Sequence, residues 1–146
     1  MIQGKPLLES VLAPVLALIV WSLVMWLWMY ITRIPAMTKA GIKPRDARFP
    51  GSLSKLPDGV RAAADNYNHL MEQPTIFYAL AFLTYLLGLQ SPLTAGLAWG
   101  YVALRVVHSL VQVTVNAVTV RFLVFVLSTL VLATWTIGVV LDVAKS

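Results

Sequence analysis

Two stretches of the chain carry ionisable and amide side chains at helical spacing within otherwise apolar sequence. In the first stretch these side chains fall on one face of a helix, at offsets of 0, 3, 4 and 7: Asp65, Asn68, His69 and Glu72. In the second stretch the offsets are 0, 3, 7 and 11, for Arg105, His108, Gln112 and Asn116. An ionisable side chain at the centre of a membrane span raises the free energy of membrane insertion by roughly 2.5–3.5 kcal/mol. These two faces are therefore the first candidates for a functional site.

The short connection between the two stretches predicts an antiparallel hairpin. If the chain folds back near residues 88–90, Glu72 comes to the depth of Arg105, and we predict an ion pair between them. The same register sets His69 opposite His108, Asp65 opposite Gln112, and Arg61 opposite Asn116. The result would be a hydrated polar seam that opens toward the cytoplasm.

Such a seam has several interpretations. A cluster of Arg, Asn and Glu suits a small zwitterionic or anionic ligand, because Arg binds carboxylates through two parallel hydrogen bonds. The same residues could instead only lock two helices together, as buried polar groups do in membranes. A transport path is disfavoured because residues 76–89 offer few polar side chains. No metal site is predicted, since the two histidines have no cysteine and a single carboxylate nearby.

The composition predicts an all-α integral membrane protein. Of 146 residues, 59% are hydrophobic and 12% are charged, against about 45–50% and about 25% in soluble domains. The chain has no cysteine, which excludes disulfides and thiolate metal sites. Any thiol chemistry would have to be supplied by a cofactor.

Four apolar segments predict a single domain, residues 1–146, built as a four-transmembrane-helix bundle in the lipid bilayer. The predicted helices span about 10–33, 59–88, 92–117 and 120–143. Pro74 lies inside the second and predicts a kink or a tolerated break there. Residues 34–58 form a loop rich in Lys, Arg, Pro and Gly.

The distribution of Lys and Arg predicts the orientation in the membrane. Most of them lie in the first loop, and the third connection adds Arg121, whereas the second connection has none. By the positive-inside rule the basic loop is cytoplasmic and both termini lie on the opposite side. Basic residues that flank apolar spans do not indicate a nucleic-acid partner, although the pI is near 9.8.

At these residues the chain resembles the MAPEG superfamily, the membrane-associated proteins of eicosanoid and glutathione metabolism. The resemblance rests on a second helix with Asn68 and Glu72 before Pro74, and on a third helix with Arg105. The stretch 65–74, followed by Phe77 and Tyr78, is most similar to uncharacterised bacterial members. The resemblance implies a homotrimer with glutathione bound between subunits, near the cytoplasmic side.

The resemblance also implies roles for individual residues. Arg121 would be catalytic, stabilising a thiolate that attacks a hydrophobic electrophile arriving from the bilayer, as in a glutathione transferase or peroxidase. The implied glutathione-binding residues are Arg33, Arg61, Asn68, Glu72, Arg105, His108 and Gln112. This sequence departs from the family pattern, because Asn68 and Glu72 are four residues apart rather than three, and because His108 and Gln112 stand in place of tyrosines. The alternative is a protein of this fold that binds another thiol or small amphiphile, or acts as a non-catalytic scaffold.

Overall fold

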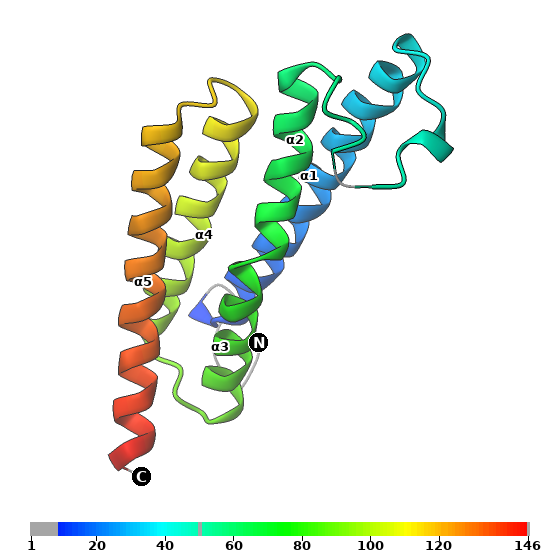
Figure 1. Cartoon of the computed structure of the whole chain (residues 1–146). Coiled ribbons are helices and arrows are strands. Elements are labelled where there is room, and N and C mark those ends of the chain that lie inside the picture. The colour runs from blue at the N-terminus through cyan, green and yellow to red at the C-terminus, as the bar shows by residue number, and fades with distance from the viewer. Residues whose placement is uncertain (1–8, 50, 146) are drawn as a thin grey trace.

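The computed structural model describes residues 9–49 and 51–145, and in this part of the chain all regular secondary structure is helical, without strands (Figure 1). The helices are α1 (Leu12–Lys39), the short 3-10 helix η2 (Pro44–Asp46), α2 (Asp58–Met71), α3 (Pro74–Leu86), α4 (Pro92–Val113) and α5 (Val118–Lys145). The prediction of an all-α protein is confirmed.

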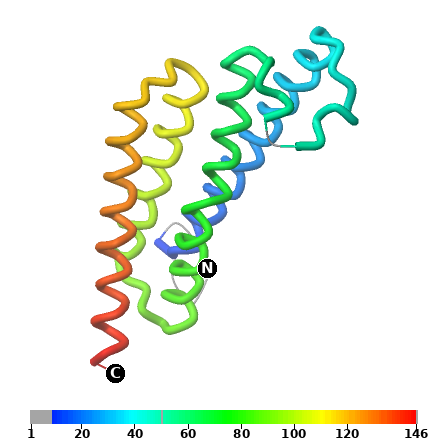
Figure 2. The backbone as a smooth tube through the Cα atoms, in the orientation of Figure 1, coloured from blue at the N-terminus to red at the C-terminus, as the bar shows by residue number. Residues whose placement is uncertain are grey.

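The helices form two antiparallel pairs. Helix α1 packs against α2, α4 packs against α5, and contacts between α2 and α4 join the two pairs. The smooth trace in Figure 2 shows the loop after α1 and the turn after α4 at one end of the bundle. The connection from α3 to α4 and the end of α5 lie at the other end.

The predicted second helix, 59–88, is wrong in one respect, because it is broken into α2 and α3. Pro74 has no N–H and its ring cannot sit against the carbonyl of a preceding helical turn. The chain leaves helical geometry at Glu72, with φ −91° and ψ −97°, and the backbone angles are helical again from Gln73, just before the first residue of α3. The break falls in the middle of the polar stretch singled out above.

Other helix ends differ from the prediction by a few residues. Helix α1 runs through Pro35 to Lys39, so the basic loop begins at residue 40 rather than 34. Helix α4 ends at Val113 instead of residue 117, and α5 extends two residues beyond the predicted range at each end. Between them Asn116 adopts a left-handed conformation with φ 49°, which Asn tolerates better than most residues.

The apolar core lies where the first half of α1 meets α3, α4 and α5. The ring of Phe77 stacks on that of Tyr101 with centroids 4.7 Å apart, and meets Trp135 edge-on at 6.0 Å. All three side chains are fully buried. The start of α1 is fixed to this end of the bundle by Ser10, whose hydroxyl donates to Oε1 of Gln90 at 2.9 Å.

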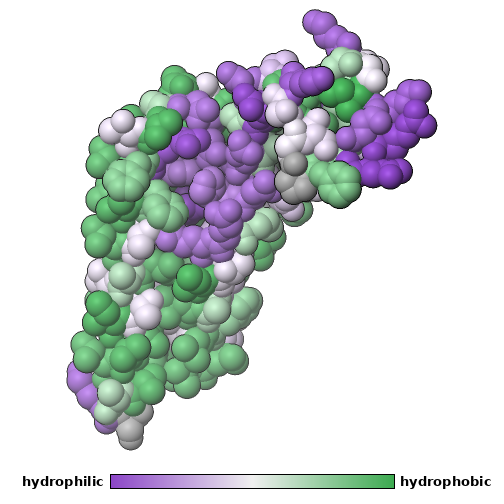
Figure 3. Space-filling view, in the orientation of Figure 1, coloured by the Kyte–Doolittle hydropathy of each residue, from purple (hydrophilic) through white to green (hydrophobic). Residues whose placement is uncertain are grey.

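Helices α1 and α5 are each 28 residues long and apolar enough to cross a membrane. Many of their large apolar side chains are exposed. Figure 3 shows polar side chains gathered over α2 and the basic loop, whereas the surface of α5 and the opposite end of the bundle are apolar. Length and apolarity alone would also fit buried helices of a soluble protein. The exposure of these apolar surfaces fits a protein surrounded by lipid.

Candidate functional site

Five of the eight predicted site residues line two separate pockets. The first, which we call the histidine pocket, lies between α2, α4 and α5 and has a volume of about 220 Å³. It is lined by His69, His108, Val118, Arg121, Phe122 and Phe125. The second, the arginine pocket, lies between α1, the basic loop and α2 and has a volume of about 490 Å³. It contains Arg33, Arg61 and Asn68.

Two histidines from different helices face each other in the histidine pocket. The rings of His69 on α2 and His108 on α4 lie with centroids 5.7 Å apart in an edge-to-face arrangement, which confirms the predicted opposition. His108 is buried, and its Nδ1 has no hydrogen-bond partner among the described residues. Phe125 of α5 lies 6.4 Å from the His108 ring and closes the pocket on that side.

Arg121 lies in the first turn of α5, at the rim of the histidine pocket. One of its terminal nitrogens donates to Oδ1 of Asn116 at 2.7 Å, which holds the side chain over the turn between α4 and α5. Its Nε is buried and has no hydrogen-bond partner in the part of the chain that the structure describes. The N-terminus of a helix carries partial positive charge, so the guanidinium and the start of α5 together favour an anion here.

The predicted ion pair between Glu72 and Arg105 is wrong. Among the described residues, Glu72 is instead near His69, with its Oε2 3.1 Å from Nδ1. Arg105 is fully buried, and one terminal nitrogen donates to the backbone carbonyl of His69 at 2.9 Å. Its guanidinium also lies 5.9 Å from the centre of the Phe125 ring.

The break between α2 and α3 explains this difference. In an unbroken helix the carbonyl of His69 would accept from the N–H of Gln73. At the break the carbonyl of His69 accepts instead from the N–H of Glu72, at a long 3.4 Å, and from the guanidinium of Arg105 at 2.9 Å. The break also turns Glu72 outward, so that its side chain is 65% exposed.

The break is held by residues of the other helix pair, which sequence reasoning missed. The hydroxyl of Tyr101 on α4 donates to Oε1 of Gln73 at 3.3 Å. The amide nitrogen of Gln73 donates to Oγ1 of Thr129 on α5 at 2.8 Å. The only signal for these contacts was Pro74, which predicted a kink without indicating what would hold it.

Further buried polar groups lie on α2 and α4. Gln112 is buried on α4, and its Oε1 has no hydrogen-bond partner within the described ranges. The same holds for both side-chain polar atoms of Asn66 and for the hydroxyl of Ser109. Buried polar groups without partners cost free energy, and such groups are characteristic of sites that take water or a ligand.

Arg61 and Asn116, predicted to lie opposite each other, bind other partners. Arg61 forms an ion pair with Asp58 one turn earlier on α2, and Asn116 binds Arg121. Within one chain, therefore, Arg33, Arg61 and Asn68 belong to the arginine pocket. His108 and Arg121 belong to the histidine pocket, with Glu72 beside His69 and Arg105 and Gln112 buried on α4.

In the described part of the chain no three His, Cys, Asp or Glu side chains are grouped so that they could hold a metal ion. The charged and polar side chains that line the two pockets are mostly cations and hydrogen-bond donors. These suit an anionic or zwitterionic organic molecule.

A comparison with protein-family models finds one described as the MAPEG family, which matches residues 11–141. The match runs from the start of α1 into the last turns of α5 and includes both pockets. Comparisons with curated proteins and with solved structures find no match.

Proposed function

The chain belongs to the MAPEG family and is an integral membrane protein, and we propose that it binds a small thiol, glutathione or a close analogue, in the histidine pocket. There it would convert the thiol to a thiolate for attack on an apolar electrophile from the bilayer. This is transferase or peroxidase chemistry. Since the chain has no cysteine, the sulfur must belong to the ligand.

The observation that carries this proposal is the position of Arg121. Its guanidinium stands at the start of α5 beside His108, and its Nε has no partner among residues 9–49 and 51–145. Cationic side chains and helix N-termini lower thiol pKa values because they stabilise the charged form. A donor placed where negative charge develops also stabilises the transition state.

The remaining polar groups near the pocket suit the charged ends of such a ligand. Glu72 is exposed beside His69 and would accept from an ammonium group. Arg105 fixes the backbone at His69 and so positions that histidine. His108 and Gln112 offer hydrogen bonds from α4.

A single chain provides only part of the site. The histidine pocket holds about 220 Å³, whereas pockets for drug-sized ligands hold about 300–1,000 Å³. We propose that a homotrimer supplies the missing wall. Arg33, Arg61 and Asn68 would contact the same thiol only across such a subunit boundary, because within a protomer they line the arginine pocket.

We further propose that the chain crosses the bilayer four times, with α2 and α3 together making the second crossing. The basic loop and the turn before α5 would be cytoplasmic, and both termini would lie on the opposite side. This orientation follows the excess of Lys and Arg in the first loop. It places the histidine pocket within reach of a water-soluble thiol from the cytoplasm.

The proposal is tested by titrating the detergent-purified protein with glutathione and following thermal unfolding. Wild type should show saturable stabilisation, because a ligand that binds only the folded state raises its stability. Arg121→Ala should lose most of this stabilisation. Lys145→Ala, which removes the same charge at the far end of α5, should keep it.

Failure to stabilise wild type at millimolar glutathione would contradict the proposal. It would favour a protein of this family that binds another small amphiphile or acts as a scaffold. Equal stabilisation of wild type and Arg121→Ala would contradict the role given to Arg121.

A further inference from the structure

A thiol that becomes a thiolate in the histidine pocket gives up a proton, and a group near it must accept that proton. Arg121 is permanently charged and cannot take up another proton. Carboxylates have pKa values of about 4, too far below the thiol value of about 8.5 to accept the proton. Histidine accepts and returns protons near neutral pH. The two histidines of the chain, His69 and His108, both line this pocket and are the candidates.

His108 is poorly placed to hold an added charge. It is 4% exposed on α4, and its Nδ1 has no hydrogen-bond partner within the described ranges. Arg105 lies three residues earlier on the same helix, and both side chains lie against the ring of Phe125, at 5.9 and 6.4 Å. A positive charge on His108 would therefore be desolvated beside a cation, and both effects oppose it.

His69 is well placed to hold the same charge. Its side chain is 39% exposed, and Oε2 of Glu72 lies 3.1 Å from its Nδ1, a contact that becomes an ion pair when the ring is protonated. Opposite charges at this distance attract each other, and partial exposure avoids the cost of full burial. The carboxylate also favours hydrogen on Nδ1 of the neutral ring, which leaves the lone pair on Nε2.

The break between α2 and α3 holds this histidine by its backbone. Arg105 donates to the carbonyl of His69 at 2.9 Å, so this contact does not occupy the imidazole ring. A substitution of the ring therefore keeps the bond that fixes the backbone. The other charged or titratable groups around His69 come from three helices: Asp65 and Glu72 at α2, Arg105 and His108 on α4, and Arg121 on α5.

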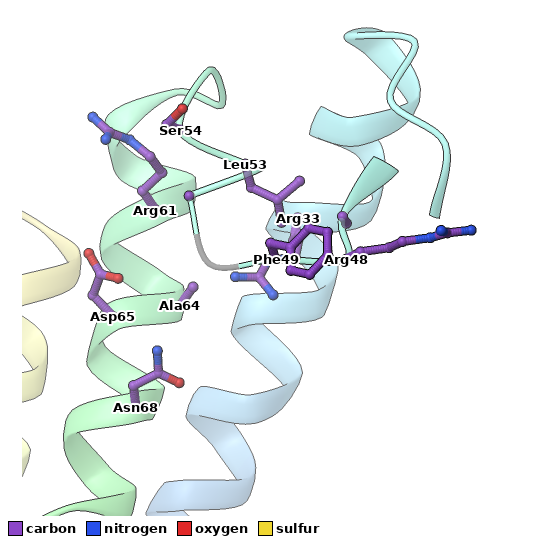
Figure 4. Close-up of a pocket in the computed structure, with 11 residues that line it drawn as sticks. Arg33, Arg48, Phe49, Leu53, Ser54, Arg61, Ala64, Asp65 and Asn68 are labelled. Atoms are coloured by element: carbon purple, nitrogen blue, oxygen red, sulfur yellow. The ribbon is translucent and has the colours of Figure 1, made fainter. Parts of the chain in front are cut away.

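The arginine pocket, on the α1 side of α2, is suited to a different task. Its charged side chains are three arginines and Asp65. In Figure 4 the guanidinium of Arg33 reaches toward α2 and the amide of Asn68 points toward α1, whereas the carboxylate of Asp65 extends away from Arg33. Guanidinium and amide groups bind the carboxylates of a ligand, and a carboxylate is too weak a base to take a thiol proton.

We propose that His69 is the base that accepts the thiol proton, and that Glu72 is a positioning residue that stabilises the resulting imidazolium. This inference rests on the thiol binding proposed above. The S–H bond breaks, its electron pair stays on sulfur, and the proton bonds to Nε2 of His69. When the thiolate attacks, that electron pair forms the new bond from sulfur. The proton then passes from His69 to the atom of the electrophile that gains the negative charge.

The experiment counts the protons that leave the protein when glutathione binds. Calorimetric titrations at about pH 7.5, where free imidazole is mostly neutral, use buffers of different ionisation enthalpy, and ultraviolet absorbance gives the amount of thiolate formed. S-methylglutathione, which has no thiol proton, corrects for all other groups. Wild type should release almost no proton for each thiolate, whereas transfer of the thiol proton to water would release about one.

Four variants assign the acceptor, and their melting temperatures show whether each is folded. His69→Gln should release about one proton for each thiolate that still forms, whereas His108→Gln should match wild type. Glu72→Gln should lie between these values, because the imidazolium loses its counter-charge. Asp65→Asn removes a carboxylate one turn before His69 and should match wild type.

A second measurement observes the proton in wild-type protein. Since the chain has two histidines, their ring signals in the NMR spectrum of histidine-labelled protein can be assigned with His108→Gln. Glutathione should shift the His69 signal to that of a protonated ring, and S-methylglutathione should not.

The inference is overturned if wild type releases about one proton for each thiolate, or if the ring of His69 is already protonated before glutathione is added. Equal proton release by His69→Gln and His108→Gln would also overturn it. In each of these cases a thiolate still forms, so the proposed function stands. Bound glutathione without a thiolate would contradict the proposed function and this inference with it.

Discussion

The guanidinium of Arg105 ends on a backbone carbonyl rather than on a carboxylate. Its partner, the oxygen of His69, is available because the helix breaks a few residues later. Glu72, which idealised helical geometry places at the same depth, is turned outward beside His69. Arg105 therefore supports the shape of the backbone at the site, and Glu72 stays exposed beside His69.

This arrangement predicts weak coupling between Glu72 and Arg105. In a double-mutant cycle with Glu72→Gln and Arg105→Met, the two changes in unfolding free energy should add to within about 0.5 kcal/mol. Gln73→Leu and Tyr101→Phe, which remove two ends of one hydrogen bond, should couple more strongly and serve as the positive control. Chemical denaturation in detergent micelles measures both cycles. A coupling free energy well above about 0.5 kcal/mol between Glu72 and Arg105 would indicate that the two side chains form an ion pair after all.

How far single residues can be predicted from sequence depends on whether their helix is regular. The opposition of His69 and His108 follows from folding a hairpin at residues 88–90, and the structure confirms it. The partner of Glu72 could not be found in this way, because the break changes the direction of its side chain. Phe125 carries no signal at all, since a phenylalanine in an apolar helix is ordinary.

At the scale of elements, the break between α2 and α3 is stabilised by hydrogen bonds from other helices and is not only the local effect of a proline. Gln73 at the break is bound by α4 through Tyr101 and by α5 through Thr129. Three helices therefore meet at the point where the polar half of the bundle gives way to the apolar core around Phe77.

Loss of one of these bonds should be measurable. Tyr101→Phe keeps the ring that stacks on Phe77 but removes the hydroxyl bound to Gln73, and should destabilise the protein by about 0.5–1.5 kcal/mol. Tyr85→Phe removes a hydroxyl from the neighbouring helix α3 and should stay within about 0.5 kcal/mol of wild type. Denaturant titration of both variants measures their free energies of unfolding. Equal losses in the two variants would show that the hydrogen bond from Tyr101 to Gln73 contributes nothing to stability.

The ends of the helices were predictable where the sequence carries a local signal. Helix α4 begins as predicted, with Pro92 in its first turn and with Ser91, whose Oγ accepts from the N–H of Thr94 at 3.1 Å. The end of α1 was not predictable in this way, because Pro35 is a signal for stopping and yet the helix continues to Lys39.

At the scale of the whole molecule, the bundle has a polar end and an apolar end. Polar side chains cover α2 and the basic loop, and apolar ones cover the opposite end (Figure 3). Composition and charge predicted the membrane and the helical class. The number of subunits could not be predicted from the residues, because the periodicity of apolar residues along the helices is not specific to any one oligomeric state.

The proposed orientation can be tested with single cysteines, since the chain has none of its own. Lys55→Cys in the basic loop and Ala144→Cys near the end of α5 should be labelled by a membrane-impermeant maleimide from opposite sides. In inside-out vesicles we expect Lys55→Cys to react and Ala144→Cys to react only after the membrane is permeabilised. Labelling of both positions from one side would contradict the three crossings that the proposal places between the basic loop and the end of α5.

The measurement that tests the central claim most directly is the ultraviolet absorbance of the thiolate of bound glutathione, followed against pH. A free cysteine thiol has a pKa of about 8.5, and cations or helix N-termini lower it to about 3.5–7.5. In wild type the thiolate signal should therefore develop at least about one pH unit below that of free glutathione, because Arg121 and the start of α5 stabilise the charged form. In Arg121→Ala it should return toward the pH of the free thiol. A signal at the same pH with and without the protein, under conditions in which glutathione is bound, would contradict the account.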